Sequence, residues 1–369
     1  MLKGIRVLDL TRLYPGPYCT LFLSDYGAEV IKVEDKKAGD YLRHMSSDIQ
    51  DMGARFVALN RGKKSITLNL KDNQEYQQFL ELVRTADVLI EGFRPGVMKR
   101  LKLDYENLKD INKGLIYCSL TGFGQTGPYA QMAGHDLNYT SLSGLAKYQS
   151  DRDGNPVVPG FQVADLAGGS MMAISAILLA LFHRERTGKG QYIDVSMLDG
   201  TLSLMPSLIP DFFTGKEHIP GAERLTGGLA CYNLYETKDN KWMSVACLER
   251  KFWEEFCTIL DHEHWIDLHL KPVQVQEKLK KNLQKLFKQE DQFFWVEKFS
   301  NSDCCVSPVH GLGDVMNDPH IQSRNLIQQV NIDGETYHSI RKPVIMSEDR
   351  YVSKAEAPKR GENNDEYFK

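Results

Sequence analysis

The sequence predicts an α/β protein with a large Rossmann-like domain on a parallel sheet and a smaller α+β domain. Apolar, β-rich runs alternate with helical segments through the first half of the chain. Loops rich in glycine or proline follow several of these runs. After residue 228 the pattern changes to a hairpin followed by helices. At 369 residues the chain is long enough for two domains.

The chain opens with a βαβ pattern. Residues 5–10 form an apolar strand, Pro15-Gly16-Pro17 breaks the chain, and residues 18–26 form a helix that ends at Gly27. Residues 30–33 supply the next strand, which predicts parallel pairing. The first turn lacks the G-x-G-x-x-G fingerprint and the chain has no P-loop, which argues against dinucleotide- and triphosphate-binding classes.

The rest of the large domain continues this alternation. Residues 39–62 are predicted to be a loop. Further strands are predicted at 65–70, 88–93, 115–120 and 192–197, and helices at 72–86 and 168–184. Ligands bind at the carboxyl ends of strands in open α/β sheets, so the loops at 12–18, 94–96 and 121–139 are expected to share one rim.

Composition shifts divide the chain further. We predict a large domain over 1–197, an extended proline- and glycine-rich linker over 198–228, a small α+β domain over 229–310, and a return segment and tail over 311–369. The later elements are predicted as a hairpin of 232–237 and 242–246, helices at 251–260, 272–288 and 292–298, a strand at 305–309 returning toward the first domain, strand material at 336–345, and a loose polar tail at 354–369.

Composition also limits the partners. A net charge of −4 gives no basic excess for nucleic acid. The apolar run at 171–182 is shorter than the roughly 20 residues that cross a bilayer. We therefore expect no membrane span. The N-terminus is too short and too charged for a signal peptide, and the seven cysteines include no CxxC pair. These features indicate reduced thiols in a cytoplasmic protein, with no catalytic role expected for Cys304 and Cys305.

Three residues are candidates for catalysis. His135 lies in Gly134–Tyr139, on the predicted ligand rim, and an imidazole can take and return a proton near neutral pH. Asp165 stands before the predicted helix at 168–184, where it could cap the helix or act as a base. Glu249 follows the strand at 242–246 and could orient a histidine, or could be a surface carboxylate.

Other residues are candidates for substrate binding. Free N–H groups of Gly168 and Gly169 at a helix N-terminus would stabilise negative charge on a substrate oxygen. The candidates for phosphate and CoA contacts are Arg61, Lys63, Lys64, Arg94, Gly122, Gly124 and Tyr139. The spacing of the histidines at 262, 264 and 269 does not suit a metal site, so we expect no metal and no cofactor.

Several motifs together resemble the family III CoA-transferase superfamily along nearly the whole chain. They are Gly4–Leu10 with Pro15–Pro17, Asn60–Ser65, Ala86–Gly96, Thr121–Pro128, Arg186–Gln191 and Asp318–His320. Within that superfamily, Gly134–Tyr139 resembles the α-methylacyl-CoA racemase branch. Transferases of the superfamily share an aspartate that matches Asp165, where it becomes acylated, but typically lack the histidine that matches His135.

The resemblance implies a fold, an activity and a partner. It implies an interlocked homodimer, CoA bound by the large domain, and an active site completed by the partner's small domain. His135 and Asp165 would be the two bases of a racemase acting on 2-methyl-branched acyl-CoA, with a glutamate matching Glu249 supporting His135. Racemases often carry an arginine near the adenine site where this chain has Glu34-Asp35-Lys36, so Lys36 or Lys37 is expected to replace it.

Two other functions remain open from the sequence. A CoA-transferase would use Asp165 as a nucleophile toward the thioester, and CoA would then move between carboxylic acids. A non-catalytic acyl-CoA-binding protein would need neither His135 nor Asp165. The sequence also leaves open whether the acyl chain is a fatty acid, a steroid side chain or an arylpropionate.

Overall fold

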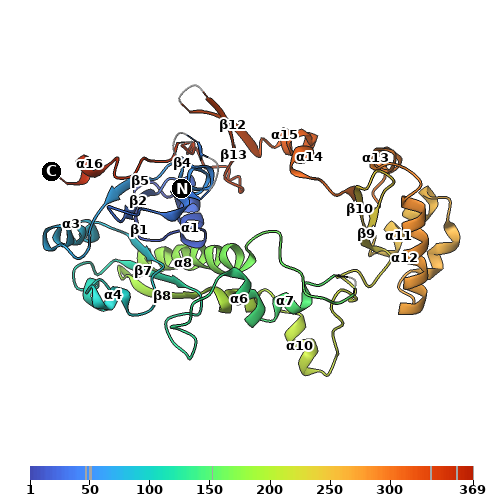
Figure 1. Ribbon diagram of the computed structural model, residues 1–369, viewed down its shortest axis with the longest axis horizontal. Helices are drawn as coiled ribbons and strands as arrows, with labels where there is room; N and C mark the ends of the chain where they lie inside the picture. The colour runs from blue at the N-terminus through green and yellow to red at the C-terminus, as the bar shows by residue number, and fades with distance from the viewer. Residues whose placement is uncertain (46–47, 50–51, 152, 333–334, 355, 369) are drawn as a thin grey trace. The chain divides into compact units, whose positions relative to one another are not determined.

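Figure 1 shows the computed structural model, which describes residues 1–45, 48–49, 52–151, 153–332, 335–354 and 356–368. The chain divides into two compact units. The first unit comprises residues 1–145, 159–206 and 320–369, and the second comprises residues 146–158 and 207–319. The domain limits drawn from the sequence, at residues 197, 228 and 310, stay predictions.

The first unit is built on a six-stranded sheet with the order β5-β2-β1-β6-β7-β8. Every neighbouring pair in it is parallel, so the predicted Rossmann-like parallel sheet is confirmed. Its strands are β1 (Arg6–Asp9), β2 (Glu29–Glu34), β5 (Lys64–Thr67), β6 (Val88–Glu91), β7 (Ile116–Thr121) and β8 (Gln191–Ser196).

Helices cover both faces of this sheet (Figure 1). Alternate residues of a strand point to opposite faces, so Val7 packs in one core and Leu8 in the other. The core around Val7 includes side chains of α1 (Pro15–Asp25) and α8 (Met172–Thr187). The core around Leu8 includes side chains of α3 (Asn73–Arg84) and of two short helices, α4 (Val97–Arg100) and α5 (Tyr105–Leu108).

Local sequence explains where these helices begin. Pro15 and Pro17 lie in the first turn of α1, where a missing N–H costs nothing and the fixed φ suits a helix. The Asp72 carboxylate caps α3 by accepting the N–H groups of Gln74 at 3.0 Å and Glu75 at 3.1 Å. The predicted helices at 18–26 and 72–86 are therefore confirmed, with small shifts at their ends.

The loop predicted over residues 39–62 is wrong for its described part. This stretch contains η1 (Tyr41–His44), β3 (Asp48–Ile49), β4 (Met52–Gly53) and α2 (Ala54–Asn60). Residues 46–47 and 50–51 lie outside the described residues. Leu42 and Phe56 are fully buried in a small core of their own, and such a short, irregular set of apolar residues has no clear period in the sequence.

The helix predicted to begin at residue 168 begins earlier. A π-helical segment, η2 (Ala164–Met171), continues directly into α8. The joined helix has 24 residues and is long and apolar enough to cross a membrane by length and composition alone, so the apolar run at 171–182 is only part of it. One side of the helix nevertheless packs into the sheet core through Ala173, Ile177 and Ala180.

The segment predicted as an extended linker, residues 198–228, is not extended throughout. It contains α9 (Met197–Ser203) and α10 (Leu208–Phe213). Two further short helices, α6 (Asp136–Leu142) and α7 (Leu145–Tyr148), follow β7.

The second unit has a three-stranded antiparallel sheet with the order β11-β10-β9. Helices pack on it around the buried Trp253 and Phe256. Its elements are β9 (Tyr232–Glu236), β10 (Trp242–Ala246), α11 (Arg250–Ile259), η3 (Glu263–Leu268), α12 (Val273–Phe287), α13 (Gln292–Phe299), β11 (Val306–Pro308) and α14 (Leu312–Asn317). The strand predicted at 305–309 exists, but it pairs with β10 and so does not return to the first domain.

The C-terminal segment begins with α15 (Pro319–Ser323) and a hairpin of β12 (Ile327–Ile332) and β13 (Glu335–Ile340). It ends at α16 (Asn364–Tyr367), where the side-chain oxygens of Asn363 and Asn364 accept the N–H groups of Ser65 and Thr67, each at 2.9 Å. These bonds satisfy the free edge of β5. The loose tail predicted for 354–369 is therefore wrong, apart from residues 355 and 369, which lie outside the described residues.

Candidate active site

His135 lies at the start of α6, beyond the loop that follows β7. Its backbone is extended, with φ −129° and ψ 175°, and its N–H donates to the Asn138 side-chain oxygen at 3.0 Å. The residue is exposed. The sequence therefore folds here as a short helix whose N-cap presents an imidazole to solvent.

Tyr139 holds this helix against the glycine-rich loop at 121–128. Its hydroxyl donates to the Gly134 carbonyl at 2.7 Å, and its ring meets the Phe123 ring edge-on with centroids 5.1 Å apart. A Cβ on Gly122 would lie 2.4 Å from the Tyr139 ring, so only glycine fits there. Gly124 has a φ of +77°, which favours glycine for a different reason. A CoA contact stays a prediction for Gly122, Gly124 and Tyr139.

Asp165 lies inside the first turn of η2, after Val163 at the N-cap position. The prediction that Asp165 caps the helix is therefore wrong. Burial, followed by the negative charge of Asp136, raises the pKa of Asp165 to about 7. A carboxyl group with that pKa is poised to release or accept a proton near neutral pH.

Asp136 connects the two candidate bases. Its carboxylate accepts the backbone N–H of Asp165 at 2.9 Å, which ties the start of α6 to the first turn of η2. His135 is the residue immediately before Asp136, so the structure brings the segments that carry His135 and Asp165 together. Sequence reasoning did not assign Asp136 this role, although its place beside His135 was a signal.

Gly168 and Gly169 do not lie at the free end of a helix. They are buried in the second turn of η2, because the helix starts at Ala164. A Cβ on Gly200 would lie 1.9 Å from the Gly168 carbonyl oxygen, so these glycines let η2 and α9 cross with their backbones in contact. The predicted N-terminal donors for an enolate are therefore not supplied by Gly168 and Gly169.

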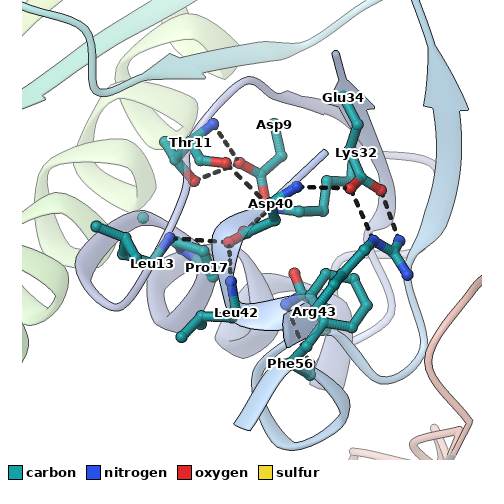
Figure 2. Close-up of polar contacts among 12 residues, drawn as sticks. Asp9, Thr11, Leu13, Pro17, Lys32, Glu34, Asp40, Leu42, Arg43 and Phe56 are labelled. Atoms are coloured by element: carbon teal, nitrogen blue, oxygen red, sulfur yellow. Dashed lines mark hydrogen bonds and ion pairs between the residues drawn. The ribbon is translucent and has the colours of Figure 1, made fainter. Parts of the chain in front are cut away.

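A buried ionic network lies at the carboxyl ends of β1 and β2 (Figure 2). Asp9 and Lys32 are paired in the sheet register. The Asp9 carboxylate accepts the Thr11 N–H at 2.9 Å and the Thr20 hydroxyl at 2.6 Å, and it lies 3.2 Å from the Lys63 ammonium. Sequence reasoning missed this cluster, although single charged residues inside apolar strands are a signal for one.

The network extends toward η1 and α2. The Lys32 ammonium pairs with the Asp40 carboxylate at 2.9 Å, fully buried. Glu34 holds Arg43 through two contacts, at 2.6 and 2.9 Å, and the Arg43 guanidinium lies 3.7 Å above the centre of the Phe56 ring (Figure 2). These contacts fix the segment that the sequence had suggested to be a loop.

Opposite charges set the protonation of this network. Burial would raise the pKa of Asp9, but the charges of Lys32 and Lys63 and the hydrogen bonds from Thr11 and Thr20 together lower that pKa to about 2. Burial lowers the pKa of Lys63 to about 8, against the opposing effect of Asp9. Lys63 is buried and its charge is balanced by the Asp9 carboxylate, so a phosphate contact would require the Lys63 ammonium to leave Asp9.

Arg61 and Lys64 are also engaged with carboxylates. The Arg61 guanidinium donates to Asp25 at 2.6 Å and to the Ile340 carbonyl at 3.0 Å. Lys64 pairs with Glu29 at 2.8 Å and with the C-terminal segment. A phosphate would have to compete with these partners, and CoA binding by Arg61, Lys63 and Lys64 stays a prediction.

The other positively charged side chains predicted to contact CoA are more accessible to solvent. Arg94 is exposed beyond β6, on the predicted rim. Lys36 makes a half-exposed ion pair with Glu75 at 2.7 Å, and Lys37 is exposed beside it. These side chains can reach a solvent phosphate at lower cost than the buried lysine of the network.

A second cluster of acidic side chains lies on the three strands β6, β7 and β8. Glu91, Ser119 and Asp194 stand side by side across β6, β7 and β8. Glu91 accepts the Ser119 hydroxyl at 2.5 Å and the Phe93 N–H at 2.8 Å, while Asp194 accepts the Gln125 N–H at 3.0 Å. This row therefore anchors the loops after β6 and β7. It was not predicted, because its members lie on three separate strands.

Burial dominates the electrostatics of this row. It raises the pKa of Glu91 to about 7, and the Asp194 charge adds to the effect. Burial also raises the pKa of Asp194 above its ordinary range. Glu91 is thus a buried carboxyl group that changes charge near neutral pH, although it is not one of the two predicted bases.

Glu249 belongs to the second unit. It is exposed at the N-cap position of α11, and its neighbour Arg250 pairs with Glu254 at 2.7 Å and with Asp267 at 3.1 Å. The Glu249 carboxylate is thus not an ion-pair partner of Arg250. Its predicted role beside His135 stays a prediction.

A cavity of about 380 Å³ lies elsewhere in the first unit. Side chains of α1, α2 and β13 line it, including Leu21, Val57 and Ile340, and the Arg61–Asp25 pair lies in its wall. His135 and Asp165 are not among its lining residues. The cavity is therefore separate from the candidate bases.

Comparisons with known proteins identify the family of this chain. Residues 2–364 match the family model described as CoA-transferase family III. Mouse succinyl-CoA:glutarate CoA-transferase is 33% identical over 364 residues, which cover 97% of this chain and 83% of that protein. Mouse alpha-methylacyl-CoA racemase is 34% identical over 382 residues, which cover 100% of this chain and 93% of that protein.

A solved structure gives the same result for the fold. The crystal structure of a CAIB/BAIF family protein from Brucella suis aligns with a TM-score of 0.86 at 30% identity, over 99% of this chain and 97% of that one. Relatives named as transferases and as racemases thus match along most of the chain. Because the family model also spans residues 2–364, this chain belongs to CoA-transferase family III.

Proposed function

We propose that this chain is a cofactor-independent racemase of 2-methyl-branched acyl-CoA thioesters. The observation that carries the proposal is the hydrogen bond from the Asp165 N–H to Asp136, which joins the segment bearing His135 to the segment bearing Asp165. The pKa of Asp165, raised by burial to about 7, suits a group that must act as a base in one direction and as an acid in the other.

The reaction in this proposal is a 1,1-proton transfer at C2. The thioester carbonyl acidifies the C2 proton, and one base removes it to give an enolate. The conjugate acid of the other base returns a proton to the opposite face. Two groups are needed because one fixed base would return the proton to its original side. His135 and Asp165 take these roles, and the CoA moiety supplies remote binding energy for positioning.

The proposal includes a homodimer and a role for Glu249. The carboxylate of Glu249, from either copy, would accept a hydrogen bond from His135 and fix its tautomer. The apolar side chains that α8 leaves exposed, among them Leu179 and Phe182, support a second copy as the covering partner.

The cytoplasm is the proposed compartment, because Cys19, Cys118 and the other buried cysteines are free thiols.

The CoA-transferase is the second candidate, because transferases are among the relatives of this chain. In that reaction the Asp165 carboxylate attacks the thioester carbonyl carbon, and the C–S bond breaks to release CoA thiolate and a mixed anhydride. CoA would then be passed to an acceptor acid. A carboxyl group with a pKa of about 7 suits either reaction, and His135, which transferases of the superfamily typically lack, favours the racemase.

One labelling experiment separates these reactions. The enzyme is incubated with (R)-2-methylacyl-CoA in deuterated water without an acceptor acid. The racemase predicts deuterium at C2 with loss of chirality. A parallel incubation contains an added carboxylate. Transfer of CoA to that carboxylate, without C2 labelling in either incubation, would overturn the racemase in favour of the transferase.

Variants of the two bases complete the test. His135→Ala and Asp165→Ala are each expected to lower the rate of interconversion by about 10² to 10⁴-fold. An exposed acidic residue of the second unit, Glu217, gives the control Glu217→Ala, which should keep full activity. If both base variants kept the wild-type rate, neither residue would be a base.

A further inference from the structure

Three cysteines lie where β10 and β11 stop pairing in the second unit. Cys247 follows β10, whereas Cys304 and Cys305 precede β11. All three are free thiols, and Cys247 and Cys304 are buried while Cys305 is exposed. The thiols therefore stand at the ends of two strands that are far apart in sequence and adjacent in the sheet.

The strand register places Cys247 opposite Cys304. Ser244 pairs with Ser307 and Val245 with Val306, and the Ala246 N–H donates to the Cys305 carbonyl at 3.0 Å. One further step along this antiparallel register brings Cys247 across from Cys304. Regular pairing ends here because Cys305 has a left-handed φ of +58°, so direct contacts between the two residues show how close they lie.

Side-chain contacts agree with the register. The Cys247 thiol donates to the Cys304 carbonyl. The Ser302 hydroxyl lies 3.1 Å from the Cys304 sulfur. Both cysteines belong to the core of the unit, whereas the contact between the Ser244 and Ser307 hydroxyls, 2.8 Å apart, is exposed.

The contacts make the two thiols chemically different. The hydrogen bond from Cys247, aided by Ser302 against the effect of burial, lowers the pKa of Cys304 to about 7. The contact with Cys304, together with burial, raises the pKa of Cys247. Cys304 is thus the thiolate of the pair, and Cys247 keeps its proton.

We propose that Cys247 and Cys304 are a modification site that forms a reversible cross-strand disulfide when the protein meets a hydroperoxide. With hydrogen peroxide, the Cys304 thiolate attacks one peroxide oxygen, the O–O bond breaks, and hydroxide is the leaving group. Cys304 thereby becomes a sulfenic acid. The Cys247 sulfur then attacks the Cys304 sulfur, the S–O bond breaks, and water leaves. With hydrogen peroxide, two thiols are oxidised to one disulfide and the peroxide is reduced to two waters.

The backbone gives the oxidant a route to Cys304. Cys305 has a φ of +58°, a left-handed conformation that ends the regular pairing of β11. Opening of this strand end exposes Cys304 without unfolding the helices of the unit. The resulting disulfide would close a covalent loop from Cys247 to Cys304 that includes α11, α12 and α13. Cys247 lies two residues before the predicted catalytic Glu249.

Peptide mapping of the full chain tests the site directly. The protein is treated with hydrogen peroxide, blocked with N-ethylmaleimide and digested without reduction. We expect a linked peptide pair containing Cys247 and Cys304 that is two hydrogen atoms lighter than the sum of its parts and disappears with dithiothreitol. Oxidation of Cys305 alone, or a link that involves Cys305, would overturn the proposal.

Matched variants separate this linkage from general oxidation. Cys247→Ser and Cys304→Ser should each abolish the linked peptide, whereas Cys305→Ser and Cys257→Ser should keep it. Cys257 is a useful control because it is buried in the same core. Oxidation should also raise the urea midpoint of the wild type, because the disulfide restricts the unfolded chain, and leave that of Cys247→Ser unchanged. Neither readout depends on the enzyme reaction.

Discussion

Asp136 carries two separable properties, its negative charge and its hydrogen-bond acceptor. The charge is the second cause, after burial, of the raised pKa of Asp165, and one carboxylate oxygen accepts the Asp165 N–H at 2.9 Å. Asp136→Asn removes the charge and keeps an oxygen acceptor. We therefore expect the limb of the pH–rate profile that reports Asp165 to move to lower pH, with kcat within about tenfold of wild type.

Asp136→Ala provides the comparison, because it removes the acceptor as well as the charge. This variant should lose more activity than Asp136→Asn, since the start of α6 is no longer tied to η2. The measurement is kcat across pH 5 to 9 for both variants and the wild type. An unchanged limb in Asp136→Asn would show that Asp136 does not act on the charge of Asp165.

Glu91 supplies a prediction about stability and pH. Burial raises its folded pKa to about 7, above the ordinary value of roughly 4.3 in an unfolded chain. A raised pKa stabilises the fold below the unfolded value, and this contribution is lost as pH rises through the folded value. From pH 4 to pH 8, Glu91→Gln should therefore gain roughly 2–4 kcal/mol of unfolding free energy relative to wild type.

Urea denaturation at several pH values measures this difference. Glu217→Gln is the matched control, because Glu217 is an exposed glutamate of the second unit, and its difference from wild type should stay flat with pH. A flat difference for Glu91→Gln would mean that Glu91 ionises as it would in water.

The sequence revealed residues whose role depends on a local motif, and missed those whose role depends on distant partners. His135 and Asp165 could be selected because Gly134–Tyr139 and the helix after Val163 are contiguous in sequence. Asp9, Lys32 and Lys63 lie on three different segments, and only the parallel pairing of strands brings their charges within contact. Nothing local to Lys63 distinguishes a buried ion pair from a phosphate ligand.

At the scale of elements, the strands were predicted more accurately than the helix ends. Strands of the sheet are nearly continuous apolar runs bounded by turns, and this pattern is plain in the sequence. The start of η2 was placed too late because Gly168 and Gly169 are typical of a helix end. Their actual role is to allow contact with α9, which only the tertiary structure reveals.

The close crossing of η2 and α9 predicts that a single added methyl group, at Gly200, destabilises the fold. Gly200→Ala would place a Cβ 1.9 Å from the Gly168 carbonyl oxygen, a contact between two backbones that neither can relieve by a rotamer change. We expect a loss of roughly 2–5 kcal/mol in unfolding free energy, despite the higher helix propensity of alanine. Because η2 carries Asp165, activity should fall with it.

Gly313→Ala is the control for helix propensity. Gly313 also lies in a helix, α14, and a Cβ there would meet nothing within 4 Å. This variant should be as stable as wild type or slightly more stable, by up to about 1 kcal/mol. Thermal and urea denaturation of both variants decide the matter, and equal stabilities would exclude a close crossing at Gly200.

At the scale of the molecule, the parallel sheet and the separate small sheet followed from the order of elements in the sequence. Which apolar side chains would remain exposed did not follow, because a helix with apolar residues on all sides shows no face in its sequence. The structure assigns Ile177 and Ala180 of α8 to the core and leaves Leu179 69% exposed and Phe182 59% exposed. Such a face on a helix that also packs in a core is typical of a surface that another chain covers.

The proposed homodimer can be tested on this face. Leu179→Glu places a charge among exposed apolar side chains without touching the buried side of α8, so it should weaken association far more than it destabilises the fold. Sedimentation velocity should give twice the chain mass of 42.0 kDa for the wild type and the single-chain mass for Leu179→Glu. Val352→Glu is the control, since Val352 is 84% exposed in the same unit, away from α8 in sequence, and should stay dimeric. A wild-type chain that sediments as a monomer at micromolar concentration would contradict the homodimer, and the exposed face of α8 would then need another partner.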